Sequence, residues 1–156
     1  MALPKSFLLN SALSVDFLFL IYVEFNLLIL DMTTQLPLAI IIEPNASLES
    51  PYAYMESSFR LDRHISTQSA LLSIAQHEPT LVSLSASFSM QQSLDILTAV
   101  KHKSVQHLIP FIFVVDLSHK ISSIPGTTWG NKLGILSSTS DVHEYNSILN
   151  RIMNAL

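Results

Sequence analysis

The sequence predicts a doubly wound α/β domain with a five-stranded parallel sheet. Three short runs, Leu38–Ile42, Leu81–Leu84 and Phe111–Val115, are apolar at nearly every position, which is typical of strands buried on both faces of a parallel sheet. Segments with helical spacing of apolar residues separate the strand segments, as in successive βα units. Because Phe59–Ile65 alternates apolar and polar residues instead, we expect it at an edge, in the strand order 2-1-3-4-5.

Turn signals bound the expected strands. Pro44 ends the first strand, since proline cannot donate to a sheet ladder, and Pro79 and Pro110 precede the third and fourth strands. Leu117–Gly130 contains Pro125-Gly126 and a second glycine, so this segment is expected to be irregular, with a shortened helix. The strands are expected at Leu38–Ile42, Phe59–Ile65, Thr80–Ala86, Phe111–Val115 and Leu133–Leu136.

Helical segments are expected between these strands and after the last one. The pattern is helical from Ser50 to Ser58. Ser66 or Thr67 is the expected N-cap of the next helix, and a serine or threonine at 138–140 that of the last, because their hydroxyls satisfy free backbone N–H groups. Ala70, Leu71, Ile74 and Ala75 are expected to share one helix face, and Leu94, Leu97 and Ala99 or Val100 follow at helical spacing in the next helix. In the last helix the expected buried stripe is Val142, Tyr145, Ile148, Leu149, Ile152 and Leu156.

The first thirty-one residues differ in composition from the rest. From Phe7 to Leu30, 18 of 24 residues are apolar, close to the length of a membrane-spanning helix. Asp16 and Glu24 interrupt the run, and a carboxylate at mid-membrane costs about 2.5–3.5 kcal/mol. We therefore expect residues 1–31 to be an apolar extension or a mis-assigned start, ahead of a domain at 32–156. A membrane-associated helix and an integral part of the fold are the alternatives.

Charge and composition exclude several classes of protein. The 8 Lys+Arg and 12 Asp+Glu residues give a net charge of −4, so the basic footprint of a nucleic-acid binder is missing. The absence of cysteine excludes disulfides, thiol catalysis and thiolate metal sites. With 3 glycines, no Gly-rich phosphate loop of the GxxxxGK[ST] or GxGxxG type occurs. We expect a cytoplasmic protein with no cofactor, no metal and no nucleic-acid partner.

Two strings resemble the receiver domain of two-component response regulators, within a match that covers residues 36–156. STQSALLSIAQHEPTLVSLS at 66–85 is similar to the stretch from the second helix through the third strand, which leads to the family's phosphoryl-accepting aspartate. KHKSVQHLIPFIFVVD at 101–116 is similar to the end of the third helix and the fourth strand. The resemblance implies a flavodoxin-like fold and a bacterial signal-transduction module.

The resemblance assigns the family's active positions to particular residues. The acidic pair that holds Mg²⁺ falls on Glu43 and Pro44, and the phosphoryl acceptor falls on Ser85. The Thr or Ser of the fourth strand and the lysine after the fifth fall on Val115 and Ser137. Phosphoryl transfer to a carboxylate needs an acceptor, a cation and positive charge, so the resemblance implies a non-phosphorylatable pseudo-receiver. Its degenerate pocket comprises Glu43, Pro44, Ser85, Val115, Asp116 and Ser137.

Other groups carry weaker signals for chemistry. The six histidines include His102 and His107, whose spacing is unusual for metal ligands. Ser85 and Asp116 are not part of a G-x-S-x-G nucleophile elbow, and Glu43 after the first strand would repel a flavin phosphate. We expect a non-enzymatic protein-interaction module. A small-molecule-binding or enzymatic flavodoxin-like domain, or the same domain tethered to a membrane through residues 7–30, are the alternatives.

The partner is expected to be another protein, and a homodimer remains open. Receivers commonly bind partners through their fourth helix, fifth strand and fifth helix, which correspond here to residues 117–156. For Trp129, packing within the domain is favoured over a role at an interface. The candidate interaction surface comprises Trp129, Lys132, His143 and Tyr145.

Overall fold

The computed structural model describes residues 5–34, 36–45, 51–104, 107–116 and 129–155. The chain divides into two compact units, Met1–Leu36 and Pro37–Leu156. The division falls at a proline, and the residue before a proline is held in an extended conformation that ends a helix upstream. The irregular segment expected at 117–130 lies outside the described residues as far as residue 128.

The first unit contains one long helix, α1 (Lys5–Thr34). The helix continues through Asp31 and Met32, so the change in composition there is not a helix boundary. Its described side chains include twelve large apolar groups between Val15 and Ile29, each 37–68% exposed. Within the described part of the chain, no helix is both long enough and apolar enough to cross a membrane.

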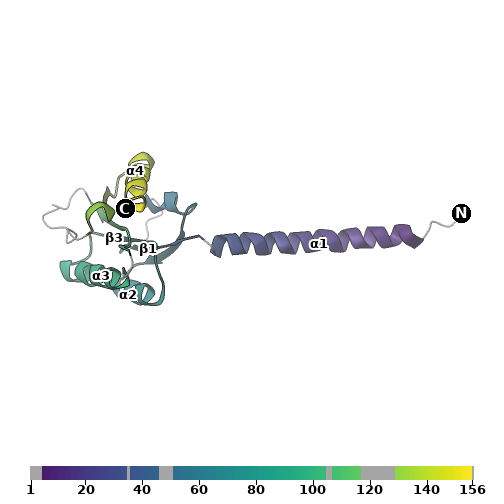
Figure 1. Ribbon diagram of the computed structural model, residues 1–156, viewed down its shortest axis with the longest axis horizontal. Coiled ribbons are helices and arrows are strands. Elements are labelled where there is room, and N and C mark those ends of the chain that lie inside the picture. The colour runs from purple at the N-terminus through teal and green to yellow at the C-terminus, as the bar shows by residue number, and fades with distance from the viewer. Residues whose placement is uncertain (1–4, 35, 46–50, 105–106, 117–128, 156) are drawn as a thin grey trace. The chain divides into compact units, whose positions relative to one another are not determined.

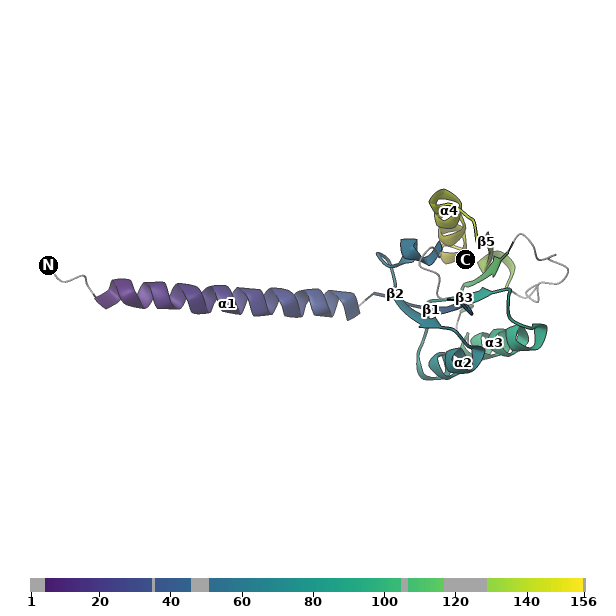
Figure 2. The ribbon, with the colours of Figure 1, turned by 180° about the vertical axis from the view of Figure 1, so that it is seen from behind.

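The second unit contains a five-stranded parallel sheet in the order β2-β1-β3-β4-β5 (Figures 1 and 2). This arrangement confirms the predicted fold class and strand order. Two strands have the expected bounds, and the others differ by one residue at one or both ends. The strands are β1 (Leu38–Ile42), β2 (Arg60–His64), β3 (Leu81–Ser85), β4 (Phe111–Val115) and β5 (Leu133–Ser137).

Burial separates the central strands from the edge strands. Every residue of β1 and β4 is buried, as are the first four residues of β3, which is what their continuous apolar runs predict. β2 lies at an edge, and Phe59 just before it is buried. The expected strand extended to Ile65, but β2 ends at His64 and the Ile65 side chain beyond it is 68% exposed.

Helices cover both faces of the sheet (Figure 2). The helices α2 (Thr67–Gln76) and α3 (Met90–Lys103) pack on one face, against a core that includes Ile40 and Ile42. The 3₁₀ turn η1 (Pro51–Met55) and helix α4 (Val142–Met153) pack on the other face, with Ala39 and Ile41. Successive side chains of β1 therefore enter opposite cores, as the alternation of a strand requires.

The helix termini correct two sequence expectations. Ser66 caps α2 by accepting a hydrogen bond from the Ser69 backbone N–H at 3.3 Å, as predicted. The cap of α4 is Asp141 rather than residue 138, 139 or 140, because its carboxylate accepts from the backbone N–H groups of His143 and Glu144, both at 2.9 Å. The helix expected at Ser50–Ser58 is the shorter η1, and a second 3₁₀ turn, η2 (Gly130–Lys132), precedes β5.

Candidate functional site

The register of the sheet brings the pocket residues to its carboxyl edge. Ile42 pairs with Leu84, so Glu43 and Ser85 follow on neighbouring strands. Val115 pairs with Ser137 at the ends of β4 and β5. Open α/β sheets bind ligands outside the carboxyl ends of their strands. The residues that the resemblance assigns to the pocket therefore follow or end the strands at the edge where such a site is expected.

Glu43 is half-buried directly after β1. Its backbone N–H donates to the His64 carbonyl at 2.9 Å, whereas its Oε1 is buried without a hydrogen-bond partner among the described residues. Burial raises the pKa of the Glu43 carboxyl, and the nearby charge of Arg63 only partly opposes this. Pro44, which is exposed, supplies no second carboxylate. A single desolvated carboxyl group binds Mg²⁺ poorly, because the ion requires octahedral coordination by oxygen atoms.

The two serines at this edge are held in local turns. The Ser85 hydroxyl accepts from the Ser87 N–H at 3.3 Å and donates to the Ser87 hydroxyl at 3.0 Å. The Ser137 hydroxyl accepts from the Thr139 N–H at 3.2 Å and lies 2.9 Å from the Thr139 hydroxyl. Serine side chains commonly bond to the backbone two residues ahead in turns. The hydrogen bonds of both hydroxyls therefore stabilise the turns that end β3 and β5.

The end of β4 contributes Val115 and Asp116. Val115 is buried, and its carbonyl accepts from the Ser138 N–H at 2.9 Å. Asp116 is exposed, and β3 separates its strand from that of Glu43, which places the two backbones about 10 Å apart at normal strand spacing. In the part of the chain that the structure describes, no three His, Cys, Asp or Glu side chains gather into a metal-binding group. The residues present do not fit a Mg²⁺ ion.

Comparison with known proteins finds similar structures but no similar sequence family. No known sequence family and no curated protein matches the chain. A response regulator receiver protein from Sinorhizobium medicae superposes with a TM-score of 0.56 at 11% identity, over 78% of this chain and 98% of that one. The chemotaxis protein CheY4 of Vibrio cholerae gives 0.55 at 10% identity, over 75% and 98%. A receiver domain from Methylobacillus flagellatus gives 0.54 at 17% identity, over 76% and 99%.

The fold is that of a response-regulator receiver. This finding confirms the resemblance seen in the sequence, and at these identities it establishes the fold alone.

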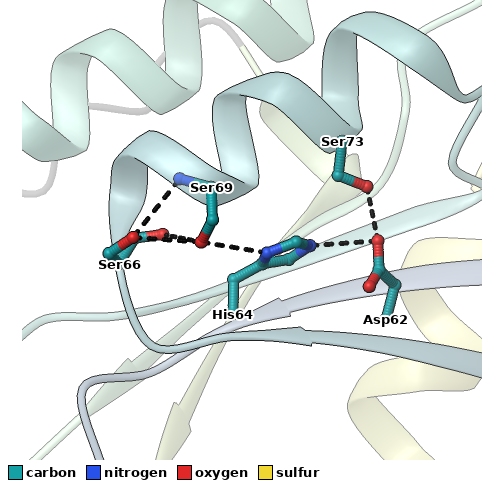
Figure 3. A network of polar contacts seen from close by, with 5 residues as sticks. All are labelled: Asp62, His64, Ser66, Ser69 and Ser73. Atoms are coloured by element: carbon teal, nitrogen blue, oxygen red, sulfur yellow. Dashed lines mark hydrogen bonds and ion pairs between the residues drawn. The ribbon is translucent and has the colours of Figure 1, made fainter.

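A polar network joins β2 to α2 in this receiver fold (Figure 3). Asp62 Oδ2 accepts a hydrogen bond from the Ser73 hydroxyl and lies 3.0 Å from His64 Nε2. His64 Nδ1 lies 3.1 Å from the Ser69 hydroxyl, which donates to the Ser66 carbonyl at 3.0 Å. We call these five residues, Asp62, His64, Ser66, Ser69 and Ser73, the β2–α2 clasp.

A spacing in the sequence could have revealed the clasp. Asp62 and His64 are two residues apart and so share one side of β2, while Ser66, Ser69 and Ser73 recur with the period of one helix face. The signal was missed because the alternation of β2 was interpreted only through its apolar residues. In this edge strand, the polar side chains that alternate with the apolar ones contact a helix as well.

The clasp has the chemical order of a serine, histidine and carboxylate site, but its contacts are structural. A nucleophilic serine must give its proton to the imidazole, whereas the Ser69 hydroxyl donates to the Ser66 carbonyl. Nε2 of His64 is buried and makes no well-directed hydrogen bond within the described chain, although the Asp62 carboxylate is at ion-pair distance. The arrangement holds an edge strand to a helix.

The environment of Asp62 favours its ionised form. Burial of the carboxyl opposes ionisation, but the contacts of Ser73 and His64, together with the charges of His64 and His77, outweigh it. The pKa of Asp62 therefore lies below its ordinary value. This direction is opposite to that of Glu43 at the carboxyl edge.

Two buried tyrosines lie on the face covered by η1 and α4. The Tyr52 hydroxyl is 3.0 Å from the Ser83 hydroxyl, and both side chains are buried. The Tyr145 hydroxyl is buried with no hydrogen-bond partner among the residues described. Burial raises the pKa of both phenols; at Tyr52 the Ser83 hydrogen bond opposes the increase, and at Tyr145 the nearby Tyr52 adds to it. Both remain neutral core residues at ordinary pH.

Two of the four candidate interaction residues belong to the core. Trp129 is 4% exposed, and its Nε1–H donates to the Ile109 carbonyl at 2.9 Å. Tyr145 is fully buried. Their apolar surfaces complete the cores on opposite faces of the sheet, so neither side chain is available to a partner. Lys132 is half-buried and His143 is exposed, and these two remain at the surface.

Proposed function

We propose that the domain is a non-enzymatic pseudo-receiver, a signal-transduction module that acts by binding another protein. The end of β3 carries the proposal. Ser85 occupies the position that the resemblance gives to the phosphoryl acceptor, and its hydroxyl is engaged in its own turn. A hydroxyl without an adjacent base is a weak nucleophile, and the sequence after β5 contains no lysine to neutralise a transferring phosphoryl group.

The test of this proposal is phosphoryl transfer from a small donor. Incubation of the purified full chain with acetyl phosphate and Mg²⁺ should leave its intact mass unchanged. The Ser85→Asp variant should also remain unmodified, because an acceptor alone restores neither the second Mg²⁺ carboxylate nor the lysine. A receiver with an intact acidic pocket, treated in parallel, is the positive control. A mass increase of one phosphoryl group on the wild-type chain would contradict the proposal.

The partner surface is proposed to lie on β5 and the start of α4. Ile135 on β5 is 39% exposed, and His143 on the first turn of α4 is exposed. Substitutions Ile135→Ser and His143→Glu should release proteins, including further copies of this chain, that co-purify stoichiometrically with the native chain. The matched control is Leu94→Ser on α3, at 40% exposure. Equal loss of binding in the control, or none in the two test variants at unchanged circular dichroism, would refute this surface.

A further inference from the structure

A cavity of about 300 Å³ opens at the amino edge of the sheet, the edge opposite the receiver pocket. Residues that precede β3, β4 and β5 line it, together with the end of α4. This volume is at the lower limit of small-molecule sites in proteins. The lining residues that matter here are Glu78, Thr80, His107, Ile109, Lys132 and Met153.

Opposite charges line this cavity from different strands. Glu78 lies three residues before β3 and Lys132 lies directly before β5, and β4 separates these two strands. Neither side chain forms an ion pair with any residue that the structure describes. His107, which is exposed, and Thr80 also line the cavity. The lining of the cavity therefore includes one acidic and one basic residue that have no ion-pair partner in the described part of the chain.

Apolar residues also line the cavity, and hydrogen bonds hold its lining segments to the rest of the fold. Ile109 is buried and Met153 is half-buried. The Ile109 carbonyl accepts a hydrogen bond from the indole of Trp129 at 2.9 Å, and the Thr80 N–H donates to the Leu38 carbonyl at 2.8 Å. These contacts tie the segments that line the cavity to the sheet, so the site is formed before a ligand binds, which lowers the entropic cost of binding.

We propose that this cavity binds a small zwitterion with an ammonium group at one end, a carboxylate at the other and an apolar section between. Glu78 would pair with the ammonium group. Lys132 would pair with the carboxylate, assisted by His107. Ile109 and Met153 would contact the apolar middle, where burial contributes about 25 cal/mol for each Å² removed from water. A ligand with only one charge leaves one of the two side chains without a partner.

Isothermal titration of the full chain with 6-aminohexanoate tests the proposal, with hexylamine and hexanoate as single-charge analogues. Because partly exposed ion pairs contribute little, we expect 6-aminohexanoate to bind about fivefold more tightly than either analogue. Lys132→Met should weaken 6-aminohexanoate about fivefold and leave hexylamine unchanged. Glu78→Gln should weaken 6-aminohexanoate and leave hexanoate unchanged.

Charged residues outside the cavity provide the matched controls. Lys101 on α3 and Glu144 on α4 are exposed, and Lys101→Met and Glu144→Gln should bind 6-aminohexanoate as the wild type does. Melting temperatures of all four variants establish that they fold. The proposal is overturned if 6-aminohexanoate does not saturate, if all three probes bind equally, or if the control variants weaken binding as much as Lys132→Met and Glu78→Gln.

Discussion

The β2–α2 clasp and the carboxyl edge of β1, β3 and β5 contain the same residue types but use them differently. In the clasp, the Asp62 carboxylate accepts a hydrogen bond from the Ser73 hydroxyl and faces the His64 imidazole, and three serines connect the strand end to the helix. At the carboxyl edge, the Ser85 and Ser137 hydroxyls bond within their own turns, and Glu43 Oε1 has no partner in the described chain. The contacts that polar residues make are therefore stronger evidence of their role than the positions they occupy.

The two carboxyl groups show the same contrast in their ionisation. Asp62 is surrounded by donors and positive charge, and its pKa is lowered. Glu43 is desolvated and opposed only by the charge of Arg63, and its pKa is raised. Ionised Asp62 is a stabilising group, whereas ionised Glu43 costs stability. Variants at the two sites should therefore change stability in opposite directions.

The largest effect is expected at the clasp. Asp62→Ala removes the carboxylate that accepts the hydrogen bond of the buried Ser73 hydroxyl, and it should lower the free energy of unfolding by about 1–3 kcal/mol. Ser85→Ala, which breaks only a turn bond near the surface, should change it by less than about 0.5 kcal/mol. Urea unfolding at pH 7 measures both. Equal effects would remove the distinction between the two regions.

The buried tyrosines sharpen the comparison in the core. Tyr52→Phe leaves the buried Ser83 hydroxyl without its tyrosine partner, so it should destabilise the fold by about 1 kcal/mol. Tyr145→Phe removes a buried hydroxyl that has no partner in the described chain, so stability should stay constant or rise. The same ring is kept in both variants, and thermal unfolding compares them directly. A larger loss for Tyr145→Phe would contradict this assignment.

The pH dependence of stability should differ for the two carboxyl groups. The stabilising contribution of Asp62 is present above its ordinary pKa of 3.8 and is lost as the pH falls through its lower folded value. The difference between wild type and Asp62→Asn should therefore shrink below about pH 4. Unfolding free energies measured from pH 7 to pH 2.5 provide the test. A difference that stays constant over this range would show that the charge of Asp62 is unimportant.

The smallest effect is expected for Glu43→Gln. The folded-state pKa of Glu43 lies above its ordinary value of 4.5, so ionisation costs stability at pH 7 and the cost disappears as the pH falls below that folded value. The variant should be more stable than wild type at pH 7, by a few tenths of a kcal/mol for this half-buried group, and equal to it near pH 4. Loss of stability at pH 7 would indicate that Glu43 has a partner.

The sequence predicted the sheet better than it predicted the polar contacts. The apolar runs of β1 and β4 specify central parallel strands because only buried strands tolerate them. The cap of α4 was misplaced because Asp141 and the residues at 138–140 are all good caps, and only the geometry shows that the Asp141 carboxylate reaches two N–H groups. Trp129 and Tyr145 carry polar atoms that suit either a core or an interface, so only the packed structure shows that both are buried.

Magnesium binding tests the central claim most directly, because a receiver's phosphoryl chemistry depends on that ion at the carboxyl edge. The measurement is a titration of the full chain with MgCl₂ followed through the backbone amide resonances of Glu43, Ser85 and Asp116. The lone, desolvated Glu43 and the distant Asp116 predict small, linear and non-saturating shifts through the millimolar range. Saturable shifts that cluster at these three residues would contradict the account.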